Sequence, residues 1–203
     1  MYARVNRFKS QPDEVDKSIA WWGEHIAAMR PPGRQGSVLF VDRGTGEGVS
    51  IGLWTSLEAL TQDEPANIQV RTEAQNATQL ELLPVERYEV SARVGAEKPT
   101  GAARLTWTEG APERLDDGIQ WWRENTGQWW QTQPGGEGAL LLVDRATGKA
   151  ISMTLWESDE AMRASETGGG QLSSSGSQAL DRRVVSVGRY EVAGWVEYSA
   201  VAH

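Results

Sequence analysis

At 203 residues, 39% hydrophobic and 24% charged, the chain has a globular composition, and its net charge of −8, with no cluster of Lys and Arg, argues against nucleic acid or an anionic membrane as a partner. The absence of cysteine excludes disulfides, thiolate nucleophiles and Cys-ligated metals, and fits a cytoplasmic protein. No apolar run reaches ~18 residues and no apolar signal region stands at the N-terminus, so we expect neither a membrane span nor a secretory signal.

The first half of the chain shows the pattern of a small unit of strands and helices. Residues 2–8 alternate as a strand does, and Pro12 then begins a helix whose apolar positions recur at helical spacing. The expected elements, in chain order, are a strand at 2–8, a helix from 12 to 30, hairpin strands at 38–41 and 49–54, a helix from 56 to about 79 and a strand at 87–94. Their order, βαββαβ, is that of a ferredoxin-like unit.

The second half repeats the first. Leu53-Trp54 and Arg87-Tyr88-Glu89-Val90 reappear 102 residues later, and Trp21-Trp22 reappears 100 residues later. Chance does not keep such a register, so the chain is a tandem duplication. We expect one ferredoxin-like unit at 1–94, a linker at 95–101 and a second unit at 102–198.

The second repeat is predicted to have the same elements with one exception. They are a strand at 102–108, a helix at 112–130, hairpin strands at 139–143 and 150–156, a helix from 158 and a strand at 187–196. The glycines and serines of 168–176 predict a flexible loop in place of most of the second helix.

Each ferredoxin-like unit covers one face of its sheet with two helices and leaves the other face bare. Apolar side chains occupy both bare faces, among them Val5, Ile51 and Leu105. Apolar faces of this size must be covered, and the duplication provides the cover. We therefore expect an α+β chain whose two units form one intramolecular barrel.

Three features of the sequence resemble the dimeric α/β-barrel superfamily, and within it the antibiotic-biosynthesis-monooxygenase type of domain. They are the βαββαβ order, an Asn in the first strand (Val5-Asn6-Arg7) and the Leu-Trp-x-Ser-x-Glu-Ala sequence that begins at Leu53 and again at Leu155. The resemblance implies a barrel that two chains normally form, with a ligand cavity between helices and sheet. Here the chain would be either a monomer, whose two repeats form a pseudo-dimer, or a homodimer.

The resemblance also implies two kinds of chemistry. Some members of the superfamily oxidise phenolic polyketides with oxygen and no cofactor, whereas others bind and degrade haem. In both, the first-strand Asn and the Trp that ends strand three line the cavity. Asn6 and Trp54 match these positions; in the second repeat Trp156 matches and Thr106 replaces the Asn. No His stands on the second helix to bind haem, so we expect no cofactor.

The candidate site is in the first repeat. By strand parity, one face of the sheet carries Arg4, Asn6, Phe8, Ser50 and Trp54, and Trp22 of the first helix faces it. Polar groups among apolar ones suit a small-molecule pocket, and Gly52 would leave room there. Asn6 would stabilise an oxyanion or enolate. The alternative is that Asn6 binds local backbone and Trp54 fills the core.

Three charged or titratable side chains leave alternatives open. Arg4 and Arg104 either form ion pairs with Glu89 and Glu191 or bind an acidic or phenolate ligand. His25 has no ligand cluster around it in the sequence, which argues against a metal site, and it remains a candidate for substrate binding or proton transfer.

The two repeats differ at the positions expected to line the pocket. Because Thr106 and Thr154 replace Asn6 and Gly52, we expect the second pocket to be smaller or blocked. The sequence as a whole predicts a small-molecule-binding protein that acts as a cofactor-independent monooxygenase on an aromatic or polyketide-like substrate. The alternative is a non-catalytic ligand-binding or assembly protein that retains the fold.

Overall fold

The computed structural model describes residues 1–95 and 99–197, and these form two compact units. Unit one comprises Met1–Arg87 and the C-terminal segment from Val192, and unit two comprises Tyr88–Glu191. The division of the sequence into repeats at 1–94 and 102–198 stays a prediction. Residues 96–98 of its linker, and residue 198, lie outside the described residues.

Unit one contains the first hairpin and its helices. Its elements are β1 (Tyr2–Lys9), a 3-10 turn (Pro12–Glu14), α1 (Val15–His25), β2 (Arg34–Val41), β3 (Glu47–Trp54), α2 (Leu57–Gln62), α3 (Glu64–Thr78), β4 (Glu81–Leu82) and the start of β5 (Glu86–Gly95). Ser56 caps α2 as expected, since its Oγ accepts a hydrogen bond from the backbone N–H of Ala59 at 3.1 Å.

Unit two repeats this order. Its elements are most of β5, then β6 (Ala102–Glu109), a 3-10 turn (Pro112–Arg114), α4 (Leu115–Glu124), α5 (Thr126–Gln131), β7 (Gly136–Asp144), β8 (Lys149–Trp156), α6 (Asp159–Ala164), α7 (Glu166–Leu180) and most of β9 (Arg183–Glu197). Ser158 caps α6 in the way that Ser56 caps α2.

The strands pair in the same register in the two units. On β1 and β3, Arg4 stands opposite Gly52 and Asn6 opposite Ser50; on β6 and β8, Arg104 stands opposite Thr154 and Thr106 opposite Ser152. The hydrogen-bonded order is β3-β2-β9-β6-β8-β7-β5-β1-β4, and β3 also pairs with β1. The expected α+β class, with tandem ferredoxin-like units of the dimeric α/β-barrel type, is confirmed.

The last strand of each repeat continues beyond its own unit. Residues 89–95 of β5 pair with β7 of unit two, although β5 ends the first repeat. Conversely, β9 pairs with β6 up to Glu191, and its end then belongs to unit one, where the carbonyl of Val196 lies against Gly36 of β2. Each compact unit therefore contains a strand segment from the other repeat.

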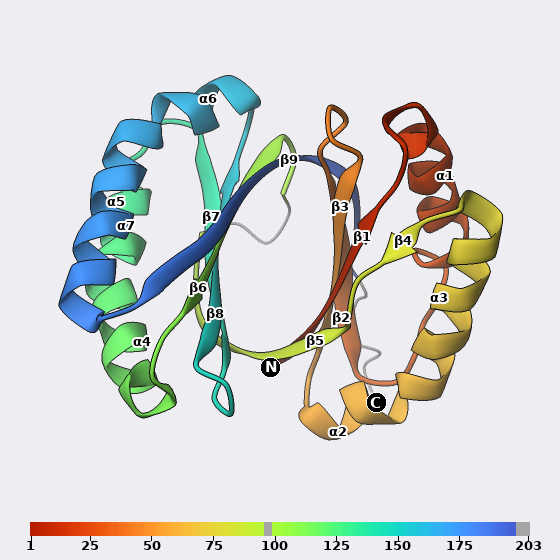
Figure 1. Cartoon of the computed structure of the whole chain (residues 1–203), viewed down its shortest axis with the longest axis horizontal. Helices are drawn as coiled ribbons and strands as arrows, with labels where there is room; N and C mark the ends of the chain where they lie inside the picture. Colours follow the sequence, from red (N-terminus) through yellow and green to blue (C-terminus); the bar gives the residue numbers. More distant parts are fainter. Residues whose placement is uncertain (96–98, 198–203) are drawn as a thin grey trace. The chain divides into compact units, whose positions relative to one another are not determined.

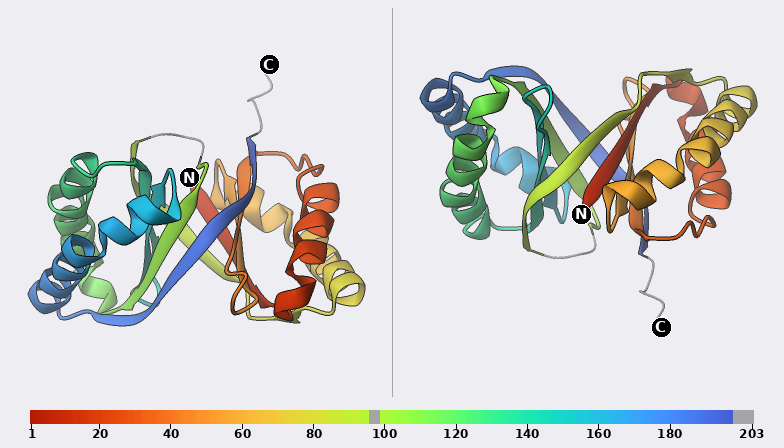
Figure 2. Two further views of the ribbon diagram at one scale, coloured as in Figure 1. Left: turned by 90° about the horizontal axis from the view of Figure 1, so that it is seen from above. Right: turned by 90° about the horizontal axis from the view of Figure 1, so that it is seen from below.

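In each unit the helices cover one face of the sheet. Figure 1 shows α1 and α3 against the strands of unit one, and α4, α5 and α7 against those of unit two; Figure 2 shows the same layers from two further sides. A hydrophobic core lies at each interface between helices and sheet, with Phe8, Trp22 and Leu39 in unit one and Trp122 and Trp156 in unit two. These layers hold the functional side chains.

The expectation of a loop at 168–176 is wrong, because α7 is continuous from Glu166 to Leu180. Three of its four glycines, Gly168, Gly169 and Gly176, lie where the helix approaches large side chains. A Cβ on Gly169 would be 2.8 Å from a guanidinium nitrogen of Arg104, and one on Gly176 would be 2.8 Å from the ring of Trp121. Packing therefore compensates for the low helix propensity of glycine, which favours a loop in isolation.

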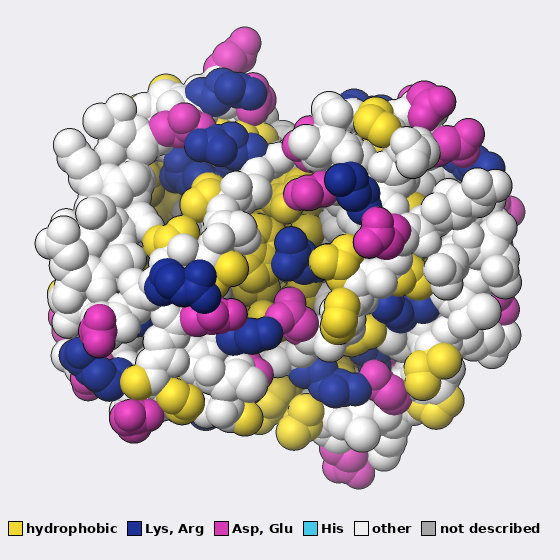
Figure 3. Space-filling model, in the orientation of Figure 1, with side chains coloured by type: hydrophobic (Ala, Val, Ile, Leu, Met, Phe, Trp, Pro, Cys, Tyr) yellow, Lys and Arg dark blue, Asp and Glu magenta, His cyan; other side chains and the backbone are white. Residues whose placement is uncertain are grey.

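Charged side chains of both signs lie at the surface. On the face shown in Figure 3, basic side chains lie beside acidic ones. Unit two carries exposed ion pairs of this kind, such as Arg145–Glu89 at 2.8 Å and Arg163–Asp159 at 2.6 Å. Among the described residues, no helix is long and apolar enough to cross a membrane.

Candidate functional site

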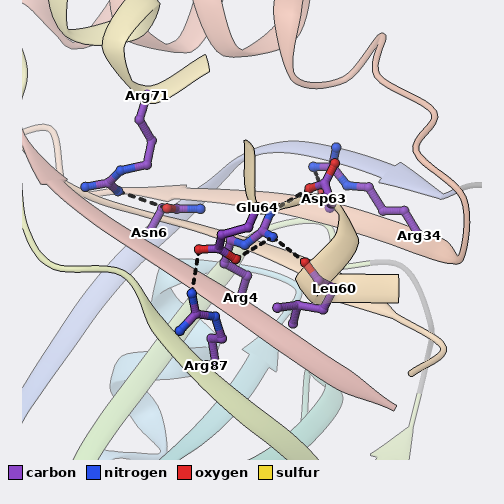
Figure 4. A network of polar contacts seen from close by, with 9 residues as sticks. Arg4, Asn6, Arg34, Leu60, Asp63, Glu64, Arg71 and Arg87 are labelled. Carbon is purple, nitrogen blue, oxygen red and sulfur yellow. Dashed lines mark hydrogen bonds and ion pairs between the residues drawn. The ribbon is translucent and has the colours of Figure 1, made fainter. Parts of the chain in front are cut away.

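Arg4 is held in a buried network in unit one (Figure 4). Its Nη1 donates to Asp63 Oδ2 at 2.6 Å, and its Nη2 donates to the carbonyl of Leu60 at 2.7 Å and to Glu64 Oε2 at 3.2 Å. Only 2% of Arg4 is exposed. The ion pair expected for Arg4 therefore exists, but its partners stand between α2 and α3 and at the start of α3; Glu89 instead binds Arg145.

Asn6 is bound by a side chain from α3 (Figure 4). Arg71 donates from Nη1 to Asn6 Oδ1 at 2.9 Å and from Nη2 to the carbonyl of Leu83 at 2.7 Å. Burial lowers the pKa of the Arg71 guanidinium, and Glu64 partly opposes this. The amide oxygen of Asn6 is thus occupied, and its NH₂ group is what remains for an oxyanion.

Trp54 is buried against β3 itself. A Cβ on Gly52 would lie 2.5 Å from the indole ring, so the space beside this glycine is taken by Trp54. The guanidinium of Arg4 stands 4.7 Å from the ring centroid, within cation–π range. The indole N–H has no hydrogen-bond partner among the described residues.

Trp22 and Ser50 are joined by a hydrogen bond that both repeats contain. Trp22 Nε1 donates to Ser50 Oγ at 2.9 Å, and Trp122 Nε1 donates to Ser152 Oγ at 2.8 Å. Because it recurs, this bond is part of how each helix docks on its sheet. It places Trp22 and Ser50 next to Asn6, which stands opposite Ser50 in the ladder.

The remaining predicted residues of unit one lie apart from this group. Phe8 is buried in the core, with its ring against Gly48. His25 is exposed near the end of α1 and stacks on Trp21, with ring centroids 4.4 Å apart. Among residues 1–95 and 99–197, no group of His, Cys, Asp or Glu is arranged to hold a metal ion; His203 lies outside them.

A cavity of about 120 Å³ lies in unit two, between the helices and the sheet. Trp121 and Trp122 of α4 and Trp129 of α5 form its aromatic side, together with Leu141 and Val143 of β7. Hydroxyl groups line the sheet, namely those of Thr106, Thr108, Ser152 and Thr154. The pocket of the second repeat is therefore open, and the expectation that it would be blocked is wrong; the alternative, that it is the smaller of the two pockets, stays a prediction.

The differences between the repeats explain the space. Where Phe8 and Arg71 fill unit one, the corresponding residues of unit two are Thr108 and Ser173, and both line the cavity. Asn67 of α3 corresponds to Gly169 of α7, which also lines the cavity. At these three positions a larger side chain in the first repeat corresponds to a smaller one in the second, and the smaller residues leave space at the cavity.

Arg104 forms one wall of this cavity, and its environment differs from that of Arg4. Ser165 replaces Asp63 at the equivalent position, and its Oγ accepts the one hydrogen bond that the side chain of Arg104 donates to the described residues, at 3.2 Å from Nη2. Burial lowers the pKa of Arg104; Glu166 opposes this and Arg189 adds to it.

A second arginine, Arg182, lines the same cavity. Its Nη2 donates to the carbonyl of Gly148 at 2.8 Å and to Thr108 Oγ1 at 3.2 Å, while its Nη1 is buried without a partner among the described residues. Burial lowers the pKa of Arg182. Leu80 takes its place in the first repeat, so this cation is new to the second.

Trp156 stands behind the cavity. It is fully buried, its Nε1 donates to Thr154 Oγ1 at 3.0 Å, and the Arg104 guanidinium lies 5.6 Å from its ring centroid. It therefore supports the two lining residues Arg104 and Thr154. The sequence pattern did not place Thr108, Ser173 and Arg182 at the site. An alignment of the two repeats provides the signal, because these residues differ in size or charge from their counterparts in the first repeat.

Comparisons with known proteins fit this architecture. No protein-family model matches the chain. It is 27% identical over 171 residues to the uncharacterized protein Rv2557 of Mycobacterium tuberculosis, covering 80% of this chain and 74% of that protein. It is 26% identical over 205 residues to the uncharacterized protein Rv2558 of the same organism, covering 95% of this chain and 84% of that protein.

Solved structures match over nearly the whole length. An anthrone oxidase-like protein superposes with a TM-score of 0.74 at 14% identity, covering 98% of this chain and 94% of that one. The chain has the dimeric α/β-barrel fold. A monooxygenase-like protein from Listeria innocua superposes with a TM-score of 0.57 at 11% identity, covering 95% of this chain and 94% of that one. The heme-degrading enzyme LmHde from Listeria monocytogenes superposes with a TM-score of 0.54 at 10% identity, covering 93% of this chain and 99% of that one.

Proposed function

We propose that this dimeric α/β-barrel protein binds a small aromatic or polyketide-like molecule in the cavity of unit two. The observation that carries the proposal is the cavity itself, with tryptophans on the helix side and hydroxyl groups on the sheet side. Apolar walls with a few polar groups are the usual composition of a small-molecule site. In this proposal the chain acts either as a monomer, in which the two repeats form a pseudo-dimer, or as a homodimer. Neither nucleic acid nor a membrane is its partner.

The test is direct binding of aromatic molecules of increasing size. Trp121, Trp122 and Trp129 line the cavity, so their fluorescence should change when an anthrone or a quinol occupies it. A structure of the soaked protein should show the ligand against these rings. Unchanged fluorescence with every compound, together with an empty cavity after soaking, would contradict the proposal.

A second candidate function is cofactor-independent oxygenation through Asn6 and Trp54 in unit one. Two observations favour it: the NH₂ group of Asn6 is not used by Arg71, and the indole N–H of Trp54 has no partner among the described residues. Hydrogen-bond donors of this kind stabilise the oxyanion that forms when a phenol is activated toward oxygen. The names of the anthrone oxidase-like and monooxygenase-like neighbours agree with this chemistry.

One observation favours the non-catalytic alternative. The cavity lies in the unit whose first strand has Thr106 in place of Asn6, whereas in the unit that has the Asn, Arg71 occupies its amide oxygen. Oxygen uptake distinguishes the two functions. Uptake with an anthrone or a quinol supports the oxygenase, and binding without uptake supports a ligand-binding or assembly protein.

A further inference from the structure

The duplication provides an internal comparison for one buried arginine. Arg4 and Arg104 occupy the same position on the first strand of their repeats, and both are at least nine-tenths buried. Asp63 neutralises Arg4 at 2.6 Å. At the position of Asp63, the second repeat has Ser165, a neutral residue that offers Arg104 one hydroxyl oxygen at 3.2 Å.

The nearest carboxylate in unit two does not replace the missing one. Glu166 corresponds to Glu64, which binds Arg4, but Glu166 forms its ion pair with Arg189 and none with Arg104. A buried cation without a counter-ion is unfavourable unless something else neutralises it. Arg104 is thus buried, as Arg4 is, but it lacks the carboxylate partner that Arg4 has in Asp63.

The cavity offers the place for that missing partner. Arg104 lines it, and so does Arg182, whose Nη1 is buried without a hydrogen-bond partner among the described residues. No Asp or Glu is among the lining residues. Two cations without an acidic residue, beside aromatic walls, match an aromatic molecule that carries a negative charge.

We propose that the unit-two cavity selects aromatic anions, either carboxylates or phenolates. Arg104 binds the anionic group of the ligand, which plays the part that the carboxylate of Asp63 plays for Arg4 in unit one. The proposal rests on the proposed function of this cavity and specifies its ligand class. Arg182 adds positive potential from its place beside Thr108 on β6, the strand that also carries Arg104. The tryptophans of α4 and α5 hold the aromatic part.

The experiment compares two probes that differ in charge and hardly in shape, naphthoate and naphthamide. Their affinities for the full chain are measured by tryptophan fluorescence and calorimetry. The wild-type protein should bind naphthoate about tenfold or more tightly, since a hydrogen bond to a charged group is worth about that factor. Arg104→Gln should reduce this preference to near unity.

A second variant keeps the arginine and supplies the partner that the first repeat has. In Ser165→Asp, the new carboxylate should bind Arg104 as Asp63 binds Arg4, and the preference for naphthoate should again disappear. Thermal melting of each variant shows that it is folded. This variant separates the loss of a free cation from the loss of a side chain that fills space.

The outcomes distinguish this inference from the proposed function. Equal affinity of the wild-type protein for both probes would overturn the anion selectivity and leave the aromatic cavity standing. A preference that persists in both variants would also overturn the role of Arg104. Binding of neither probe, with the cavity empty in soaked crystals, would contradict the anion selectivity and the proposed function together.

Discussion

Arg4 and Asp63 form an ion pair that is almost entirely inside the protein, with 2% and 6% of their side chains exposed and 2.6 Å between Nη1 and Oδ2. The two residues lie on different elements, β1 and the junction of α2 with α3. Their contact fixes the junction of α2 with α3 to β1, an inner strand of the sheet in unit one. The equivalent junction in unit two rests on the weaker contact of Arg104 with Ser165.

The first prediction concerns stability. Asp63→Ser should lower the free energy of unfolding by about 3 kcal/mol, because it leaves Arg4 buried with only part of its partners. Ser165→Asp should instead raise it, because Arg104 gains a counter-ion. Urea denaturation followed by circular dichroism measures both. If the two substitutions change stability in the same direction, the comparison of the two junctions is wrong.

The second prediction concerns the volume of the cavity. Ser173→Arg places in unit two the side chain that Arg71 provides in unit one, and it should abolish the binding of naphthoate by filling the space. The matched control is Ser175→Arg, since Ser175 is exposed on α7 and is not among the lining residues. Binding should survive in the control. Equal loss in both variants would mean that added charge on α7, rather than filled volume, prevents binding.

The third prediction concerns the glycines of α7. Apart from its chain neighbours and the nearby backbone of its own helix, Gly170 has no atom within 4 Å of the Cβ it lacks, so Gly170→Ala should stabilise the protein by about 0.5–1 kcal/mol through helix propensity. At Gly176 the same change places a methyl group 2.8 Å from the ring of Trp121. Gly176→Ala should therefore give no gain or a loss. The two midpoints of thermal unfolding test this difference, and a similar gain at both positions would contradict the close packing at Gly176.

The fourth prediction applies to the oxygenase candidate. Losing one oxyanion donor costs about 10²–10³ in rate. Asn6→Ala should lower any oxygen uptake with anthrones by this factor, whereas Thr106→Ala should leave uptake almost unchanged. Equal effects of the two substitutions would contradict an active site in unit one. The Arg71→Ser variant, which frees the amide oxygen of Asn6, controls for effects of the hydrogen bond between them.

Much of the fold could be predicted from periodic patterns and from the repeat itself. The helical stripe that includes Val15 and Trp22, and the Ser caps before α2 and α6, depend on neighbours close in sequence. The course of α7 could not be predicted, because what holds its glycines in a helix is contact with Arg104 and Trp121, far away in the chain. Local propensity alone favoured a loop there.

The site was harder to predict than the fold for the same reason. Strand parity brings Asn6, Ser50 and Trp54 to one face, and the structure agrees that Asn6 and Ser50 are opposite each other. Parity could not show that Arg71 reaches Asn6, or that Asp63 rather than Glu89 neutralises Arg4. These contacts depend on where a long side chain from another helix ends. The location of the cavity depends on small differences in volume summed over several elements.

The course of β5 and β9 makes the two halves of the gene product depend on each other. A fragment that ended after the first repeat would retain β5 but lack β7, the strand with which residues 89–95 pair, and its β2 would lose the end of β9. Such a fragment would expose unpaired strand edges, which favour association with another polypeptide. The natural complement is a second copy with the same free edges, so a single repeat has the chemistry of an obligate homodimer. Fusing two copies in one chain removes that dependence on concentration and leaves each copy free to diverge.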